Sequence, residues 1–334
     1  MKADDGKIIE EMHLQDNLFE KDIGMKPTRF GFGEALVELG DKNPNIVVLG
    51  ADLSGSVKAD LFWKKFPERF FQMGIAEQNM SGVATGLALV GKIPYIATYA
   101  VFSAGRNWDQ IRISACYPKA NIKIGGAHAG VSVGPDGATH QALEDIATMR
   151  CLPNMVVLVP TDYPQTNKAT IASAEIKGPV YLRFGREKVP IITTDDTPFV
   201  VGKADVYRDG NDVSVFACGE MVYQALLAAN ELDKEGISVR VVNNHTVKPI
   251  DEDMIVKCAA ETGAIVTAEE HQIAGGMGSA VAEIVVEKCP VPMARVGVLD
   301  RFGESGSPIE LMEEFGLTYK DIMNAVKKVI GMKK

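Results

Sequence analysis

One carboxylate, Glu77, stands within a mostly apolar stretch of small residues. Residues three and four apart share a helix face, so a predicted helix over residues 76–91 places Ser81 and Ala84 beside Glu77. Side chains this small let another backbone approach closely and remove the carboxylate from water. A desolvated carboxylate requires a strong hydrogen-bond partner or a proton. Glu77 is therefore a candidate for proton chemistry; the alternative is a first-turn glutamate that only offsets the helix dipole.

Four ring side chains follow two of the predicted strands. His128 and His140 lie in a glycine-rich loop over residues 126–141, where they could orient a hydroxylated substrate or transfer protons. The alternative is a structural loop whose imidazoles cap backbone groups. A metal site is less expected, because no cysteine or paired carboxylate accompanies the two histidines. Tyr99 and Phe102 could present their faces to a flat ligand, or could simply pack in the core.

Two arginines and a serine could together bind a phosphate group. The forked guanidinium groups of Arg29 and Arg186 match phosphate oxygens, and the Ser56 hydroxyl adds a donor. The alternatives are surface salt bridges and a turn serine. In the second half of the chain, residues 275–278 (GGMG) indicate either a phosphate cradle or a tight strand-to-helix turn.

Composition excludes several classes of partner. The chain has 334 residues, enough for about two domains. Its net charge of -9 argues against nucleic-acid binding, which requires clustered basic residues. There is no apolar run long enough for a membrane span, and residues 1–5 do not begin a signal peptide. The five cysteines are widely spaced, so we expect reduced thiols and a cytoplasmic location.

Strand-like and helix-like segments alternate from Pro27 onward, which predicts mostly parallel sheets covered by helices. In the first unit, strands are expected at residues 45–51, 94–100, 121–127, 155–160 and 180–184, and helices at 30–42, 58–69, 76–91, 104–117, 142–151 and 164–177. In the second unit, strands are expected at 212–218, 238–242, 264–268 and 293–298, and helices at 220–235, 251–262, 276–288, 308–315 and 319–331. Ligands of such sheets bind beyond the carboxyl ends of the strands.

Four longer motifs follow one another in the first half of the chain. They are ADLSGS at residues 51–56, GIAEQNM at 74–80, GGAHAGVSVGPDGATHQALED at 125–145 and LPNMVVLVPTD at 152–162. The chain resembles the C-terminal half of a transketolase and the separate C-terminal subunits of split transketolases. The resemblance implies an α/β fold with two doubly wound domains. They are a thiamine-diphosphate pyrimidine-binding domain at 27–187 and a smaller transketolase C-terminal domain at 212–334. The polar residues 1–26 are expected to form an N-terminal arm, and the polar, proline-marked segment 188–211 a linker.

The resemblance also implies a role for each candidate residue. Glu77 matches the glutamate that hydrogen-bonds the pyrimidine nitrogen of thiamine diphosphate, with Tyr99, Phe102 and Asp52 around the cofactor. The residues matching the sugar-phosphate site are Arg29, Ser56, His128, Asp136 and Arg186. His140 matches a histidine near the reacting carbon, so the catalytic set is Glu77, His140 and His128. Gly105 stands where many transketolases have a third aromatic residue.

A departure from full-length transketolases predicts a partner. Those enzymes hold the diphosphate and a divalent metal through Gly-Asp-Gly followed by Asn-Asn, and this combination is absent here. The resemblance therefore implies a separate N-terminal subunit that binds magnesium or calcium, an α2β2 assembly, and no metal ligands in this chain. The expected activity is ketol transfer between sugar phosphates, as in the pentose phosphate pathway. The alternatives are a deoxyxylulose-phosphate synthase or pyruvate dehydrogenase beta-type subunit, or a noncatalytic interaction subunit.

Overall fold

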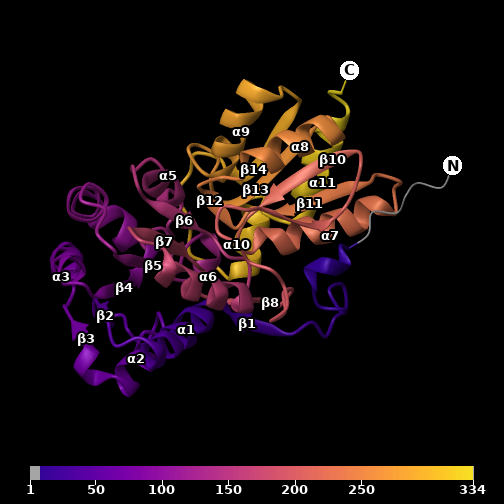
Figure 1. The fold of residues 1–334 in the computed structure, drawn as a ribbon. Helices are drawn as coiled ribbons and strands as arrows, with labels where there is room; N and C mark the ends of the chain where they lie inside the picture. The colour runs from indigo at the N-terminus through magenta and orange to yellow at the C-terminus, as the bar shows by residue number, and fades with distance from the viewer. Residues whose placement is uncertain (1–7, 334) are drawn as a thin grey trace.

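The computed structural model describes residues 8–333, which form two α/β units, each built around its own sheet. Figure 1 shows the first unit in indigo and magenta and the second in orange and yellow. The larger sheet has seven strands in the order β12-β6-β7-β5-β4-β2-β3, and the second has five in the order β14-β13-β10-β11-β9. All neighbours are parallel except β12 and β9, which pair antiparallel at the edges. The expectation of two α/β domains with mostly parallel sheets is confirmed.

The strands and helices have the following bounds. The strands are β1 Met25–Pro27, β2 Ile46–Gly50, β3 Phe70–Gln72, β4 Ile93–Tyr99, β5 Lys123–Ala127, β6 Val156–Leu158, β7 Val180–Arg183, β8 Lys188–Pro190, β9 Asp205–Arg208, β10 Val213–Ala217, β11 Val239–Asn243, β12 Thr246–Lys248, β13 Ile265–Gln272 and β14 Met293–Val298. The α-helices are α1 Thr28–Lys42, α2 Asp60–Lys65, α3 Glu77–Leu89, α4 Trp108–Gln110, α5 Asp145–Arg150, α6 Tyr163–Glu175, α7 Met221–Asp233, α8 Glu252–Thr262, α9 Met277–Lys288, α10 Pro308–Glu314 and α11 Tyr319–Ile330.

Alternation of side chains in β2 explains why helices cover both faces of the larger sheet. Successive residues of a strand point to opposite faces. Val48 packs in the cluster that contains Phe32 of α1, whereas Val47 and Leu49 pack in the cluster that contains Met80 of α3. All of these side chains are buried. Because β2 is buried on both faces, its sequence is a continuous apolar run, as expected for a strand of a parallel sheet.

One short edge strand, β12, joins the two units. β12 follows β11 in the second unit but pairs with β6 in the sheet of the first. β8 and β9 lie within the segment expected as a linker, and β8 pairs with β1. In the expected N-terminal arm, Leu14 and Leu18 are buried in the core of the second unit. Residues 1–7 of that arm, and with them the expectation about a signal peptide, lie outside the described residues.

The helix expected over residues 104–117 is irregular. Two π-helical turns, Val101–Arg106 and Ile111–Cys116, flank the short helix α4. Such turns are frequent at functional sites. Among the helices of residues 8–333, none has the length and hydropathy needed to span a bilayer.

Candidate active site

Glu77 is the first residue of α3, and its side chain is only 1% exposed. Gly74, with a φ of 71°, allows the turn that leads from β3 into the helix. A carboxylate at this end of a helix is favoured by the helix dipole. Nη1 of Arg106 donates to both carboxylate oxygens of Glu77 at 3.1 Å. Glu77 is therefore a desolvated carboxylate with a charged partner, as the sequence led us to expect.

Arg106 connects Glu77 to the predicted aromatic residues. The guanidinium carbon of Arg106 lies 4.5 Å from the centre of the Phe102 ring. The Arg106 side chain remains 48% exposed, so this partner of Glu77 is open to solvent on one side. The π-helical turn Val101–Arg106 places Phe102 and Arg106 together at the end of β4. The sequence assigned no role to Arg106, although it lies only four residues from Phe102.

The four predicted ring side chains lie together beyond β4 and β5. The rings of Tyr99 and His128 stack with centres 3.9 Å apart, and the Tyr99 ring is also stacked on Phe102 with centres 5.9 Å apart. His140 meets Tyr99 and Phe102 edge-on. A parallel sheet brings the ends of neighbouring strands to the same edge, which explains this clustering. The arrangement offers ring faces and imidazole nitrogens at one place.

His128 is held as a neutral imidazole. Its side chain is 1% exposed, and its backbone lies in the left-handed region with a φ of 56°. Burial, together with the neighbouring charges of Arg29, Arg186 and His140, lowers the pKa of His128 to about 3. Among the described residues, no group hydrogen-bonds its buried Nδ1 atom. An unpaired buried nitrogen next to a strained backbone is typical of a ligand site.

Two arginines provide positive charge beside His128. Burial and the charge of Arg186 lower the pKa of Arg29, so the two guanidinium groups are close enough to repel each other. Arg29 donates to the backbone carbonyl of Ser56 at 2.9 Å. Arg186 donates to Asp136 at 3.3 Å and to the carbonyl of Val133 at 2.7 Å. Mutually repelling arginines are stabilised when an anion binds between them.

Asp52 takes no part in these contacts. It follows β2, is exposed, and has a φ of 60°. Its backbone amide donates to the side chain of Gln72 at 2.9 Å. The contacts thus connect Glu77 with Phe102, Tyr99 and the two histidines, and connect Arg186 with Asp136. Asp52 and the Ser56 hydroxyl stay at the margin of the predicted site.

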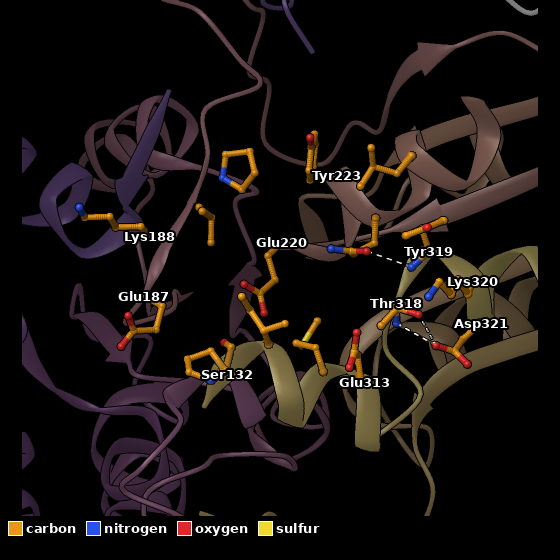
Figure 2. A pocket seen from close by; sticks show the side chains of 17 residues that line it. Ser132, Glu187, Lys188, Glu220, Tyr223, Glu313, Thr318, Tyr319, Lys320 and Asp321 are labelled. Carbon is orange, nitrogen blue, oxygen red and sulfur yellow. Dashed lines mark hydrogen bonds between the residues drawn. The ribbon is translucent and has the colours of Figure 1, made fainter. Parts of the chain in front are cut away.

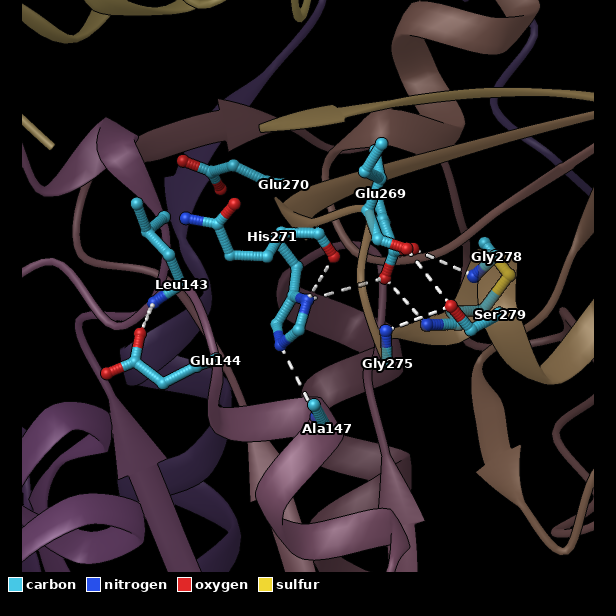
Figure 3. Close-up of polar contacts among 12 residues, drawn as sticks. Leu143, Glu144, Ala147, Glu269, Glu270, His271, Gly275, Gly278 and Ser279 are labelled. Atoms are coloured by element: carbon cyan, nitrogen blue, oxygen red, sulfur yellow. Dashed lines mark hydrogen bonds and ion pairs between the residues drawn. The ribbon is translucent and has the colours of Figure 1, made fainter. Parts of the chain in front are cut away.

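Residues 275–278 form a capped turn. The carboxylate of Glu269 accepts hydrogen bonds from the backbone amides of Met277 at 2.7 Å and Gly278 at 2.8 Å, at the start of α9 (Figure 3). Glu269 is fully buried, and a Cβ atom on Gly276 would overlap its carboxylate. The glutamate occupies the position that a phosphate would take. Of the two alternatives left by the sequence, the tight strand-to-helix turn therefore fits this segment.

Sequence reasoning missed two buried carboxylates around the glycine-rich loop. Asp145 accepts from Arg183 at 2.9 Å and from the Tyr181 hydroxyl at 2.8 Å. Glu270 accepts from the backbone amide of Ser132 at 2.5 Å. These partners are 36 to 138 residues apart, so no local pattern indicates them. For Asp145, one signal was available in the sequence. It is a carboxylate at the end of the motif at residues 125–145, and the later predicted strand at 180–184 contains Arg183.

The geometry fits a flat heterocycle beside an anionic group. A buried carboxylate can accept from a ring nitrogen, and the adjacent rings of Tyr99 and Phe102 provide apolar faces. Arg29 and Arg186, whose charges act on His128, can hold an anion beside it. Within residues 8–333, we find no cluster of three or more histidine, cysteine or acidic side chains arranged to hold a metal ion.

Comparisons with known proteins match both halves of the chain. The protein-family model for the transketolase pyrimidine-binding domain matches residues 25–191, and that for the transketolase C-terminal domain matches residues 202–322. A Methanocaldococcus jannaschii protein that bears the name of a transketolase C-terminal section is 47% identical over 310 residues. The alignment covers 91% of this chain and 97% of that protein.

Two further proteins are similar over nearly their whole length. A 6-deoxy-6-sulfo-D-fructose transketolase subunit from a Clostridium species is 43% identical, with 90% of this chain and 93% of that protein covered. A solved structure titled "Split gene transketolase, inactive beta4 tetramer" is 53% identical and superimposes with a TM-score of 0.87. The superposition covers 92% of this chain and 99% of that chain.

Proposed function

Because the chain belongs to the transketolase family, we propose that it is the C-terminal subunit of a thiamine-diphosphate-dependent transketolase. In this proposal it transfers a two-carbon ketol unit from a ketose phosphate to an aldose phosphate, and only together with a separate N-terminal subunit. The observation that carries the proposal is the buried Glu77 carboxylate, connected through Arg106 and Phe102 to the ring cluster.

Each part of the site has a task in this reaction. Bound thiamine diphosphate supplies a carbon nucleophile and an electron sink. Glu77 would accept a hydrogen bond from the pyrimidine nitrogen and so fix the tautomer of the ring, while Tyr99 and Phe102 would provide apolar contacts to it. Arg106 now donates to both oxygens of Glu77, and each oxygen keeps a further lone pair that can accept from the ring nitrogen.

The histidines and arginines act on the sugar. Neutral His128 can accept a hydrogen bond from a substrate hydroxyl, and His140 is close enough to serve the same reacting end. Asp136 can accept from a second hydroxyl. Arg29 and Arg186 hold the distant anionic group of the sugar, whose binding energy orients the reacting carbon.

Exposed apolar side chains at both ends of α3, and at Tyr117, support a partner subunit. Ile75 is 73% exposed, Leu89 and Val90 at the end of α3 are 69% and 76% exposed, and Tyr117 is 87% exposed. Apolar side chains gathered on one side of a protein mark an interaction site. We assign this surface to the N-terminal subunit, which brings the diphosphate and metal part of the site, and to self-association into α2β2. The similar split-gene transketolase is described as an inactive tetramer of beta chains alone, which agrees with inactivity of the isolated chain.

Reconstitution tests the proposal. We would purify this chain and the N-terminal subunit separately, and measure turnover of each chain and of the mixture with thiamine diphosphate and magnesium. We expect ketol exchange between sugar phosphates in the mixture and none in this chain alone. Carbon dioxide release from pyruvate would instead indicate a deoxyxylulose-phosphate synthase or pyruvate dehydrogenase type, and tight assembly without any turnover would indicate an interaction subunit.

The anion on the sugar is a separate question. A relative that is 43% identical is named for a sulfonated sugar, and paired arginines bind a sulfonate as well as a phosphate. The same assay with a phosphorylated and a 6-sulfonated ketose decides between them. A role in the pentose phosphate pathway requires faster turnover of the phosphorylated donor.

A further inference from the structure

A carboxylate of the second unit is hydrogen-bonded to the glycine-rich loop of the first. Glu270 lies in β13, is 5% exposed, and accepts from the backbone amide of Ser132 at 2.5 Å. Ser132 belongs to the short 3-10 turn between His128 and Asp136. Gly130, with a φ of 90°, lies directly against the Glu270 carboxylate. A Cβ atom at residue 130 would overlap that carboxylate. The loop and the carboxylate are therefore fitted to each other.

A second carboxylate, Glu220, faces Glu270 from the residue that precedes α7. Figure 2 shows Glu220 pointing into a cavity of about 600 Å³ between the two units, which Ser132 and Glu187 also line. Burial and the adjacent Glu220 raise the pKa of Glu270 well above its ordinary value. One oxygen of the Glu270 carboxyl group accepts from Ser132, and the buried Oε1 atom of Glu220 has no hydrogen-bond partner among the described residues.

The hydrogen bond at Ser132 is one residue away from a predicted sugar-phosphate contact. The carbonyl of Val133 accepts from Nη1 of Arg186 at 2.7 Å, and the same nitrogen lies 3.3 Å from Asp136. Fixing the amide of Ser132 fixes the peptide chain that carries this carbonyl. The second unit also holds the loop at Gln141, whose side chain donates to the carbonyl of Glu304 at 2.9 Å.

We propose that Glu270 is a positioning residue for substrate binding, which orients Arg186 through the peptide segment Ser132–Val133. The inference rests on the proposed function, because Arg186 is the predicted holder of the sugar's anionic group. It also gives the C-terminal domain a task besides assembly: its β13 strand and the segment around residue 304 form the support on which the substrate loop lies.

The test separates the reach of the Glu270 side chain from its charge. Glu270→Gln keeps the length of the side chain and an oxygen that can accept from Ser132, and it removes the carboxylate charge. Glu270→Asp keeps the acid but withdraws it by one methylene group. Glu270→Leu removes the hydrogen bond to Ser132 and applies if the Asp variant does not fold. Glu313→Asp and Glu313→Gln are the matched controls, at an exposed glutamate that lines the same cavity.

Two readouts are measured on the full chain. The first is hydrogen–deuterium exchange of the Ser132 amide in this chain alone, which requires no activity. The second is the KM and kcat for the phosphorylated donor in the complex reconstituted with the N-terminal subunit. We expect wild-type values for the Gln variant and for both controls. For the Asp or Leu variant we expect faster exchange at Ser132 and a KM raised on the order of tenfold, with kcat changed less than about twofold.

The opposite order would overturn the inference. If the Asp variant behaves as wild type while the Gln variant is defective, charge rather than reach is what Glu270 provides. Unchanged exchange at Ser132 in the Asp and Leu variants, or unfolding of both, would also refute a positioning role. If the wild-type complex shows no ketol transfer at all, the proposed function fails. The hydrogen–deuterium exchange of the Ser132 amide still decides whether Glu270 positions the loop.

Discussion

Acid should destabilise this protein through His128. The pKa of this buried imidazole is lowered to about 3 in the folded chain, whereas an unfolded histidine titrates near 6.5. Between these values the unfolded chain binds a proton that the folded chain does not, so the free energy of unfolding falls as the pH is lowered from 6.5 towards 3. At pH 5 the loss is about 2 kcal/mol, because each pH unit below 6.5 contributes about 1.4 kcal/mol. His128→Asn removes this loss, and asparagine tolerates the left-handed backbone.

The pKa itself is measured by NMR on the chain with isotopically labelled histidine, with His128→Asn assigning the resonance. We expect no titration of His128 between pH 5 and 8. Urea unfolding at pH 7 and pH 5 then compares the free energy of unfolding of wild type with that of His128→Asn. The control is His13→Asn, because His13 is exposed and its backbone also lies in the left-handed region. Titration of His128 near pH 6.5, or equal loss of stability in wild type and His128→Asn, would refute the argument from burial and neighbouring charge.

Three further predictions concern the ion pairs. Glu77→Gln and Arg106→Gln should each lower the free energy of unfolding by about 1–2 kcal/mol. The double variant should lose less than the sum of the two losses, because the two side chains hydrogen-bond each other. Additive losses in denaturant titrations would contradict this. Asp145→Asn should cost about 3–5 kcal/mol by leaving Arg183 buried and unpaired; an unchanged denaturation midpoint would argue against it. Arg186→Lys in the reconstituted complex should raise the KM for a phosphorylated donor on the order of tenfold, and that for an unphosphorylated sugar much less; equal changes would exclude contact with the anion.

The regular elements were predictable because their signals are local. The run at residues 45–51 contains the apolar strand β2, and the small-residue stretch after Gly74 contains α3. The short strands β8, β9 and β12 were not predictable, because each has only three or four residues and depends on a distant partner strand. The contact between the two units at β12, which joins the sheet of the first unit, also depends on a distant partner strand. It could therefore not be predicted from the sequence.

The candidate site was predictable in its residue types more than in its pairings. A lone glutamate, two loop histidines and a pair of aromatic residues stand out in the sequence, and the structure places Glu77, His128 and Tyr99 on one continuous set of contacts. The partner of Glu77 is 29 residues away, and the partner of Ser132 is 138 residues away. Such pairings follow from how strands are ordered in the sheets, which sequence patterns do not specify. The roles of these residues in a reaction remain predictions.

Glu77→Gln in the complex with the N-terminal subunit tests the central claim most directly. The amide keeps the size of the side chain but is a poor acceptor for a protonated ring nitrogen, so it should not fix the tautomer that the reaction requires. We expect ketol transfer to fall by at least about 1000-fold, on the scale of losing a key electrostatic group, while sedimentation shows the same assembly and thiamine diphosphate still binds. Wild-type turnover by an intact Glu77→Gln complex would contradict the account.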